Sequence, residues 1–222
     1  MRKAFVFLIC NLLLSNQLAI GQQLAEKDVA GEFMLSGVME TAAGFLLKPD
    51  HTFQYGFTYG AADKNGKGTW KLTGNKLVLN SPHAQPTSDF VLKYSKASGN
   101  NEIVVLIKDE AGNFYPYVKC RLASDPATEI TTNNKGEASF KSIGNGVLEL
   151  YHPVFSTRIS QIKLDKKHNR FIVYPAYSLA EVFFKNFTLQ IEKDHLKSSE
   201  LPGMPLQDAA AQHKQYIFIR SE

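Results

Sequence analysis

Cysteine is scarce in this chain of 222 residues, which contains only Cys10 and Cys120. Two cysteines exclude a disulfide-stapled scaffold and a zinc site built from cysteine. Long apolar runs are missing as well, because no segment approaches the 18 consecutive apolar residues that indicate a membrane-spanning helix. We therefore expect no transmembrane segment in the mature chain.

A strong charge of either sign is also missing, because 25 Lys and Arg residues oppose 21 Asp and Glu residues. Proteins that bind nucleic acid usually present a basic surface, so we expect no nucleic-acid partner. The hydrophobic content of 44% and the aromatic content of 11% are sufficient for a packed core and argue against a disordered chain.

Catalytic and metal-binding motifs do not occur either. The chain has no Gly-x-Ser-x-Gly segment and no glycine loop for phosphate. Its histidines do not have the short spacings of a zinc site; they are His51, His83, His152, His168, His195 and His213. We therefore predict that the protein is not an enzyme and uses no cofactor or metal.

What is present begins with an export signal at 1–21. Arg2 and Lys3 form a positive start, 4–14 is an apolar segment, and Ala19-Ile-Gly21 is a small-x-small cleavage site. This order is typical of a secretory signal peptide. We expect cleavage after Gly21 and a periplasmic or extracellular location.

The remaining chain consists of short alternating segments separated by turn residues, which predicts an all-β fold. The run 98–101 (Ser-Gly-Asn-Asn) interrupts the pattern. We therefore predict an antiparallel β-meander domain at 22–100 and a β-sandwich domain at 101–222. Ile103 to Ile107 is apolar on both faces, which is typical of a central strand.

Three local features give sharper expectations. His51 follows Pro49-Asp50 in a tight turn and should have a positive φ angle. Gly74-Asn75 suits a two-residue type II′ hairpin turn. Cys120 shares one strand face with Val118 and Leu122, so its thiol should be a small hydrophobic group of the core.

The first half resembles a family of secreted bacterial β-meander domains of lipocalin-like type. The resemblance rests on 45–55 (Phe-Leu-Leu-Lys-Pro-Asp-His-Thr-Phe-Gln-Tyr), on Gly68-Thr-Trp70 and on 75–79 (Asn-Lys-Leu-Val-Leu). It implies hairpin geometry and says little about function. Because about 80 residues are few for a closed barrel of eight strands, we expect a meander or a partial barrel.

The second half is similar to carboxypeptidase-regulatory-like or transthyretin-like sandwiches. Two turns carry this similarity, in 105–112 (Val-Leu-Ile-Lys-Asp-Glu-Ala-Gly) and in 131–140 (Thr-Thr-Asn-Asn-Lys-Gly-Glu-Ala-Ser-Phe). Asn133 stands where that family usually has aspartate. The resemblance implies an accessory domain without catalytic activity.

One strand offers a candidate ligand-binding face. Period-two alternation places four aromatic side chains on one side of 53–59, and Trp70 can join them; the set is Phe53, Tyr55, Phe57, Tyr59 and Trp70. Such a face either stacks on a planar ligand or packs in the domain core, and we favour the core. Gly56 on the opposite side suggests close approach of a backbone or a ligand.

Together these observations predict a secreted, non-catalytic binding or accessory protein of the bacterial cell envelope. Its partner would be an envelope or extracellular ligand, either a protein or a glycan. One alternative is a secreted hydrolase with a site assembled from dispersed residues. A further alternative is a structural or surface-assembly subunit, which an exposed apolar sheet edge would favour.

Overall fold

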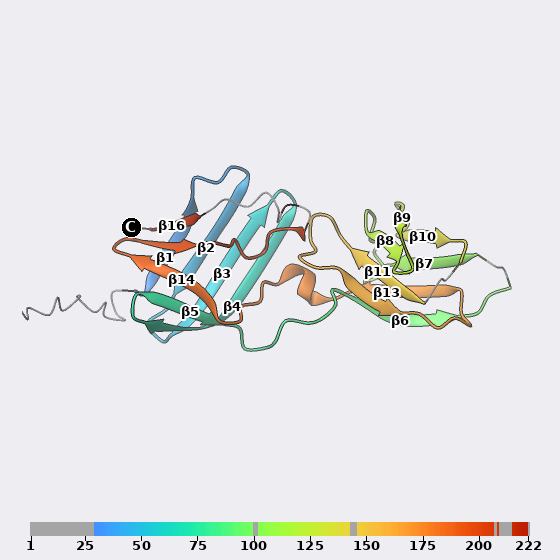
Figure 1. Cartoon of the computed structure of the whole chain (residues 1–222), viewed down its shortest axis with the longest axis horizontal. Helices are drawn as coiled ribbons and strands as arrows, with labels where there is room; N and C mark the ends of the chain where they lie inside the picture. Colours follow the sequence, from blue (N-terminus) through green and yellow to red (C-terminus); the bar gives the residue numbers. More distant parts are fainter. Residues whose placement is uncertain (1–28, 100–101, 143–145, 207, 209–214, 222) are drawn as a thin grey trace, which may run out of the picture.

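The computed structural model describes residues 29–99, 102–142, 146–206, 208 and 215–221. The expected signal peptide at 1–21 lies outside these residues. The described chain is all-β, as predicted, with a closed barrel and a sandwich placed end to end (Figure 1).

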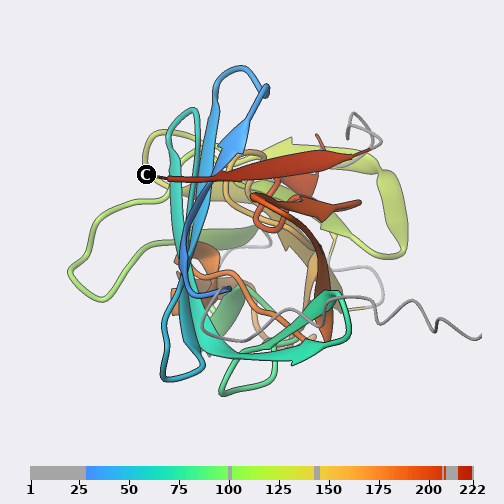
Figure 2. The ribbon, with the colours of Figure 1, turned by 90° about the vertical axis from the view of Figure 1, so that its left-hand side faces the viewer.

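Eight antiparallel strands close into the barrel in the order β1-β16-β15-β14-β5-β4-β3-β2, which Figure 2 shows end on. In chain order these strands are β1 (Gly31–Ser36), β2 (Thr41–Leu47), β3 (Thr52–Tyr59), β4 (Ala62–Thr73), β5 (Lys76–Asn80), β14 (Phe187–Glu192), β15 (His195–Ser198) and β16 (Tyr216–Arg220).

The sandwich consists of two four-stranded sheets over one core. The first sheet has the order β10 (Glu137–Phe140), β7 (Ile103–Ile107), β13 (Arg170–Pro175) and β6 (Phe90–Lys96). The second sheet has the order β12 (Ser160–Lys163), β11 (Val147–Tyr151), β8 (Lys119–Leu122) and β9 (Asp125–Thr131). As predicted, β7 is a central strand; it pairs with β10 on one side and lies parallel to β13 on the other.

The strand order differs from the predicted division at residue 100. The first five barrel strands are completed by β14, β15 and β16, so the barrel is closed and not a partial one. The sandwich, from β6 to β13, is inserted between β5 and β14. Because β6 and β7 both belong to the sheet that contains β13, the boundary between barrel and sandwich does not fall between these two strands.

The local turn predictions are confirmed. His51 has φ +65°, and Asp50 Oδ1 accepts a hydrogen bond from Thr52 N at 3.0 Å. The His51 ring lies 4.8 Å from the Trp70 ring between centroids, a contact that the sequence did not predict. A two-residue turn at Gly74 (φ +62°) joins β4 to β5. Asn133 holds its turn through its Oδ1, which accepts hydrogen bonds from Lys135 N at 2.8 Å and from Glu137 N at 3.1 Å.

Each half has its own hydrophobic core. The barrel core contains inward-facing side chains from its strands and from the connection before β14, among them Phe33, Phe45, Leu77, Leu79, Phe184, Leu189, Leu196 and Phe218. The sandwich core contains side chains of both sheets, among them Phe90, Val105, Val118, Cys120, Leu148, Leu150, Phe171 and Val173.

The prediction that Cys120 lies in a core is confirmed, because its side chain is fully buried. Burial raises the pKa of the thiol, with a smaller contribution from Glu129. We expect Cys120→Ser to lower the free energy of unfolding by about 1–3 kcal/mol, because a hydroxyl loses water there. Cys120→Ala should lower the free energy of unfolding by less than Cys120→Ser does. Urea titration measures both, and rapid reaction of the native thiol with a disulfide reagent would contradict the assignment.

A buried polar junction joins the barrel to the sandwich. Lys64 points inward from β4 and is 4% exposed. Its Nζ donates to the carbonyl oxygen of Phe155, in the loop after β11, at 2.7 Å, and to that of Gly203, in the loop before β16, at 2.9 Å. One ammonium group therefore ties a sandwich loop and a barrel loop to the same strand.

Titration of Lys64 should make stability depend on pH at the alkaline end. Burial lowers its pKa from 10.5 to about 8, while Asp89 opposes and Arg158 assists the shift. Between these values the unfolded chain holds a proton that the folded chain has released, so folding becomes more favourable as the pH rises. The free energy of unfolding of wild type, minus that of Lys64→Met, should rise by up to about 3 kcal/mol between pH 7.5 and pH 10.5. Urea titrations across this range test it; a constant difference would contradict it.

Candidate functional site

The five aromatic residues of the candidate ligand face lie in the closed barrel. Phe53, Tyr55, Phe57 and Trp70 are each at most 2% exposed, and Tyr59 is half-buried against the same core. Their side chains contact other core groups: the Phe53 ring lies 5.0 Å from the Phe184 ring, and Tyr55 Oη donates to Pro202 O at 2.8 Å. Because β14 to β16 close the barrel, these rings are covered and do not form an open stacking face.

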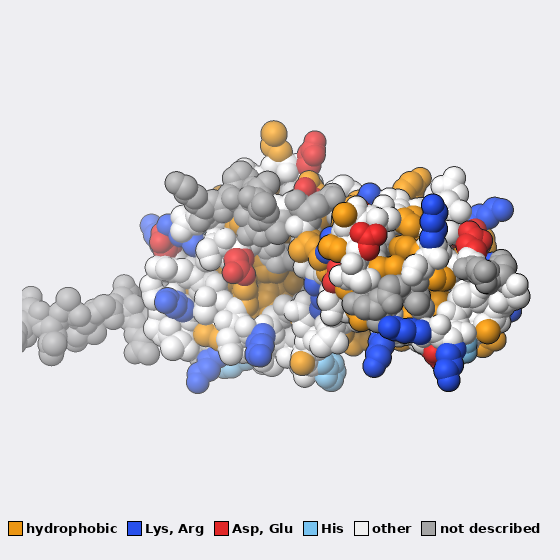
Figure 3. Space-filling model, turned by 45° about the vertical axis from the view of Figure 1, so that its right-hand side comes forward, with side chains coloured by type: hydrophobic (Ala, Val, Ile, Leu, Met, Phe, Trp, Pro, Cys, Tyr) orange, Lys and Arg blue, Asp and Glu red, His pale blue; other side chains and the backbone are white. Residues whose placement is uncertain are grey.

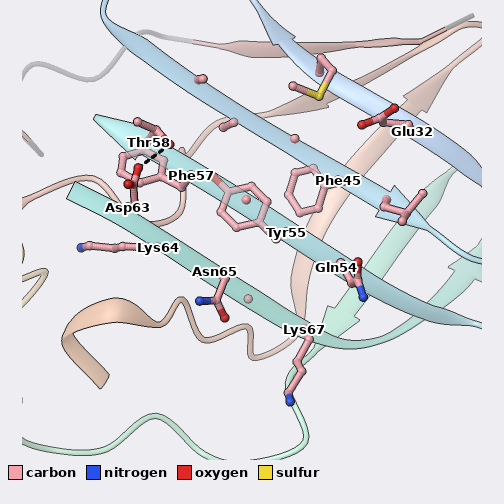
Figure 4. Close-up of a pocket in the computed structure, with 17 residues that line it drawn as sticks. Glu32, Phe45, Gln54, Tyr55, Phe57, Thr58, Asp63, Lys64, Asn65 and Lys67 are labelled. Carbon is pink, nitrogen blue, oxygen red and sulfur yellow. Dashed lines mark hydrogen bonds between the residues drawn. The ribbon is translucent and has the colours of Figure 1, made fainter. Parts of the chain in front are cut away.

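The opposite side of the same strands carries a groove of about 700 Å³ on the outside of the barrel (Figure 4). Its floor is a cross-strand row in which two glycines are direct partners, Met34–Gly44–Gly56–Asn65. A β-carbon at Gly56 would meet no atom within 4 Å. The groove exists because side chains are missing from the centre of an outward-facing surface.

Two rows of longer side chains flank the glycine row. One is Glu32–Leu46–Gln54–Lys67, and the other contains Ala42–Thr58–Asp63. Thr58 Oγ1 donates to an Asp63 carboxylate oxygen at 2.8 Å, which fixes that corner of the groove. Met34 lies across the other end, where its thioether covers Gly44. The groove therefore offers two amides, two carboxylates, an ammonium group and a hydroxyl around the open backbone of Gly56.

The two carboxylates of the groove are far apart. Glu32 is in register with Gln54 of β3, whereas Asp63 is in register with Thr58, four residues further along that strand. Three strand spacings and four residues correspond to roughly 14 Å across and 13 Å along the sheet. Glycosidases place their two carboxyl groups within about 10 Å of each other, so Glu32 and Asp63 do not form such a pair.

Metal ligands do not gather in the part of the chain that the structure describes: no group of three or more His, Cys, Asp and Glu residues is close enough to hold an ion. Over the same residues, no helix is long and apolar enough to cross a membrane. Basic and acidic side chains both occur over the face in Figure 3, in keeping with the near-neutral composition.

Sequence reasoning missed most of the groove. The sequence points to Gly56, because a glycine opposite a row of aromatic residues suggests close approach of another group. Its partner Gly44 and the flanking side chains other than Gln54 and Thr58 come from three other strands. Only the register between strands brings them together.

Comparison of the chain with protein-family models, with curated proteins and with solved structures found no match.

Proposed function

We propose that the chain is a non-catalytic glycan-binding protein, exported to the cell envelope, whose ligand lies in the outer groove of the barrel. The observation that carries this proposal is the open backbone at Gly56, which lies beside the Met34 thioether over Gly44 and between two rows that carry hydrogen-bonding side chains. Ligand sites generally combine a concave surface with a few polar groups that fix orientation.

The chemistry of the rim favours a neutral sugar chain. A pyranose ring has flat faces that can lie on bare backbone, and its hydroxyl groups donate and accept hydrogen bonds. Gln54 and Asn65 can do both, the carboxylates of Glu32 and Asp63 accept, and Lys67 donates. Two carboxylates against one exposed ammonium group do not attract an anionic ligand.

Separation of the carboxylates supports a binding role over the hydrolase alternative. A hydrolytic site needs titratable groups that converge on one bond. In the groove, Glu32 and Asp63 occupy diagonal corners, and Asp63 is held by Thr58. The aromatic rings that could have formed a stacking site inside the barrel are buried in its core.

Substitution of Gly56 tests the proposal. Gly56→Gln should fill the groove without straining the fold, because the position has open space and no left-handed φ angle. The probes are the hexasaccharides of β-1,4-linked glucose, xylose and N-acetylglucosamine, and the measurement is isothermal titration calorimetry. We expect wild type to bind at least one of them and Gly56→Gln to bind it at least tenfold more weakly, a loss of about 1.4 kcal/mol.

Gly99→Gln is the matched control, since Gly99 also has open space and no left-handed φ angle but lies in the sandwich. It should bind like wild type. The proposal is wrong if wild type binds none of the three hexasaccharides, or if Gly56→Gln binds as tightly as wild type. Release of shorter oligosaccharides during long incubation would favour the hydrolase instead.

A further inference from the structure

The groove does not end at β4. A second hollow of about 260 Å³ shares Asn65, Gly66 and Lys67 with the first. Its other walls come from the two connections between the barrel and the sandwich, and they include Ser81, His83, Tyr177 and Glu181. Because three consecutive residues of β4 line both hollows, one surface runs from the barrel onto the connections.

The connection next to β4 continues the sheet at this point. Asn65 forms an isolated parallel bridge with Glu181, and Val182 N donates to Asn65 O at 2.8 Å. Gly66 allows this approach, since a β-carbon there would meet Val182 O and the Phe184 ring. The floor row therefore gains a fifth position beyond Asn65.

Tyr177 lines the second hollow together with Glu181, and it lies on a firmly held segment. It begins the short 3₁₀ helix η2 (Tyr177–Ala180), and its side chain is 66% exposed. The next two residues are buried: Ser178 Oγ donates to Asp89 Oδ1 at 2.8 Å, and Leu179 packs in the sandwich core. The tyrosine ring is thus presented to solvent by an anchored turn.

We propose that the glycan site extends across β4 onto the connection, and that Tyr177 stacks on a sugar ring beyond Asn65. This inference rests on the proposed function. Four strand spacings from Met34 to Glu181 span about 19 Å, which is longer than a disaccharide. The ligand class is therefore an extended neutral chain, and affinity should rise with chain length until Tyr177 is reached.

Binding of a short and a long ligand to three variants tests the extension. For the sugar series that wild type binds, the hexasaccharide should bind more tightly than the disaccharide. Tyr177→Ala should weaken hexasaccharide binding roughly three- to tenfold, because an aromatic stacking contact is lost. Tyr177→Phe keeps the ring and should bind within twofold of wild type. Tyr94→Ala, at a 53% exposed tyrosine of β6, is the matched control and should have no effect.

The outcomes separate this inference from the proposed function. If Gly56→Gln loses hexasaccharide binding while Tyr177→Ala keeps wild-type affinity, the groove binds glycan but does not extend to Tyr177, and the inference is wrong. If wild type binds no hexasaccharide, the proposed function fails and the extension fails with it. Equal melting temperatures of Tyr177→Ala and wild type will confirm that any loss of affinity is not a loss of fold.

Discussion

Asp89→Ala is expected to lower the free energy of unfolding by about 3–5 kcal/mol, because it removes one partner of a buried ion pair. Asp89 lies directly before β6 and is 1% exposed. Its carboxylate is 3.0 Å from Arg158 Nη2 and accepts a hydrogen bond from Ser178 Oγ at 2.8 Å. The variant would leave the Arg158 guanidinium group, itself mostly buried, without its counter-ion.

Asp89 lies where several segments near the connections between barrel and sandwich meet, so its removal should weaken the contacts among those segments. Arg158 also donates to Pro86 O, in the connection from β5 to β6, and Asp89 N donates to Ser160 Oγ at 2.8 Å. The carboxylate thereby connects η2, the start of β6 and the segment before β12. We expect the connections between the two halves to loosen first.

Urea titration followed by circular dichroism measures the effect of Asp89→Ala. Asp125→Ala is the control, since Asp125 is an exposed residue of β9 and its removal should change stability by no more than about 0.5 kcal/mol. Asp89→Asn should lie between wild type and alanine, because an amide oxygen can still accept a hydrogen bond. If Asp89→Ala lowered the free energy of unfolding by less than about 1 kcal/mol, the Asp89–Arg158 ion pair would not be important for stability.

Phe53→Ala should destabilise the barrel by about 3–5 kcal/mol, the usual effect of removing a buried aromatic side chain. Phe53 is 1% exposed, and its ring lies 6.5 Å from that of Phe45 and 5.0 Å from that of Phe184. These contacts come from β2 and from the connection before β14, so the cavity cannot be filled by one small movement.

Fluorescence of Trp70, the only tryptophan, reports unfolding of the barrel itself. The control is Phe114→Ala, at a 50% exposed phenylalanine in the loop between β7 and β8, which should change stability by no more than about 0.5 kcal/mol. If Phe53→Ala kept wild-type stability and instead lost a ligand, the aromatic face would be a binding surface and its assignment to the core would be wrong.

Local features of the fold could be predicted from the sequence because each depends on a few neighbouring residues. The alternation in β3 predicts which side chains share a face, and the buried set 53, 55 and 57 follows it. The turn at Gly74-Asn75 and the positive φ of His51 depend on backbone geometry within four residues. The burial of Cys120 follows from the apolar character of Val118 and Leu122, which share its strand face.

Tertiary structure alone decided where the barrel closes and where the groove lies. β5 pairs with β14, and Leu79 lies opposite Phe187. No local sequence pattern predicts a strand partner that is more than 100 residues away. The partial-barrel prediction failed because it counted only the strands before residue 100. In the same way, Gly56 faces Gly44 only through register, and Asp89 meets Arg158 only when the segment before β6 packs against the segment before β12. Period-two alternation and turn chemistry act over a few residues, whereas closure, register and ion pairing depend on which distant surfaces bury each other.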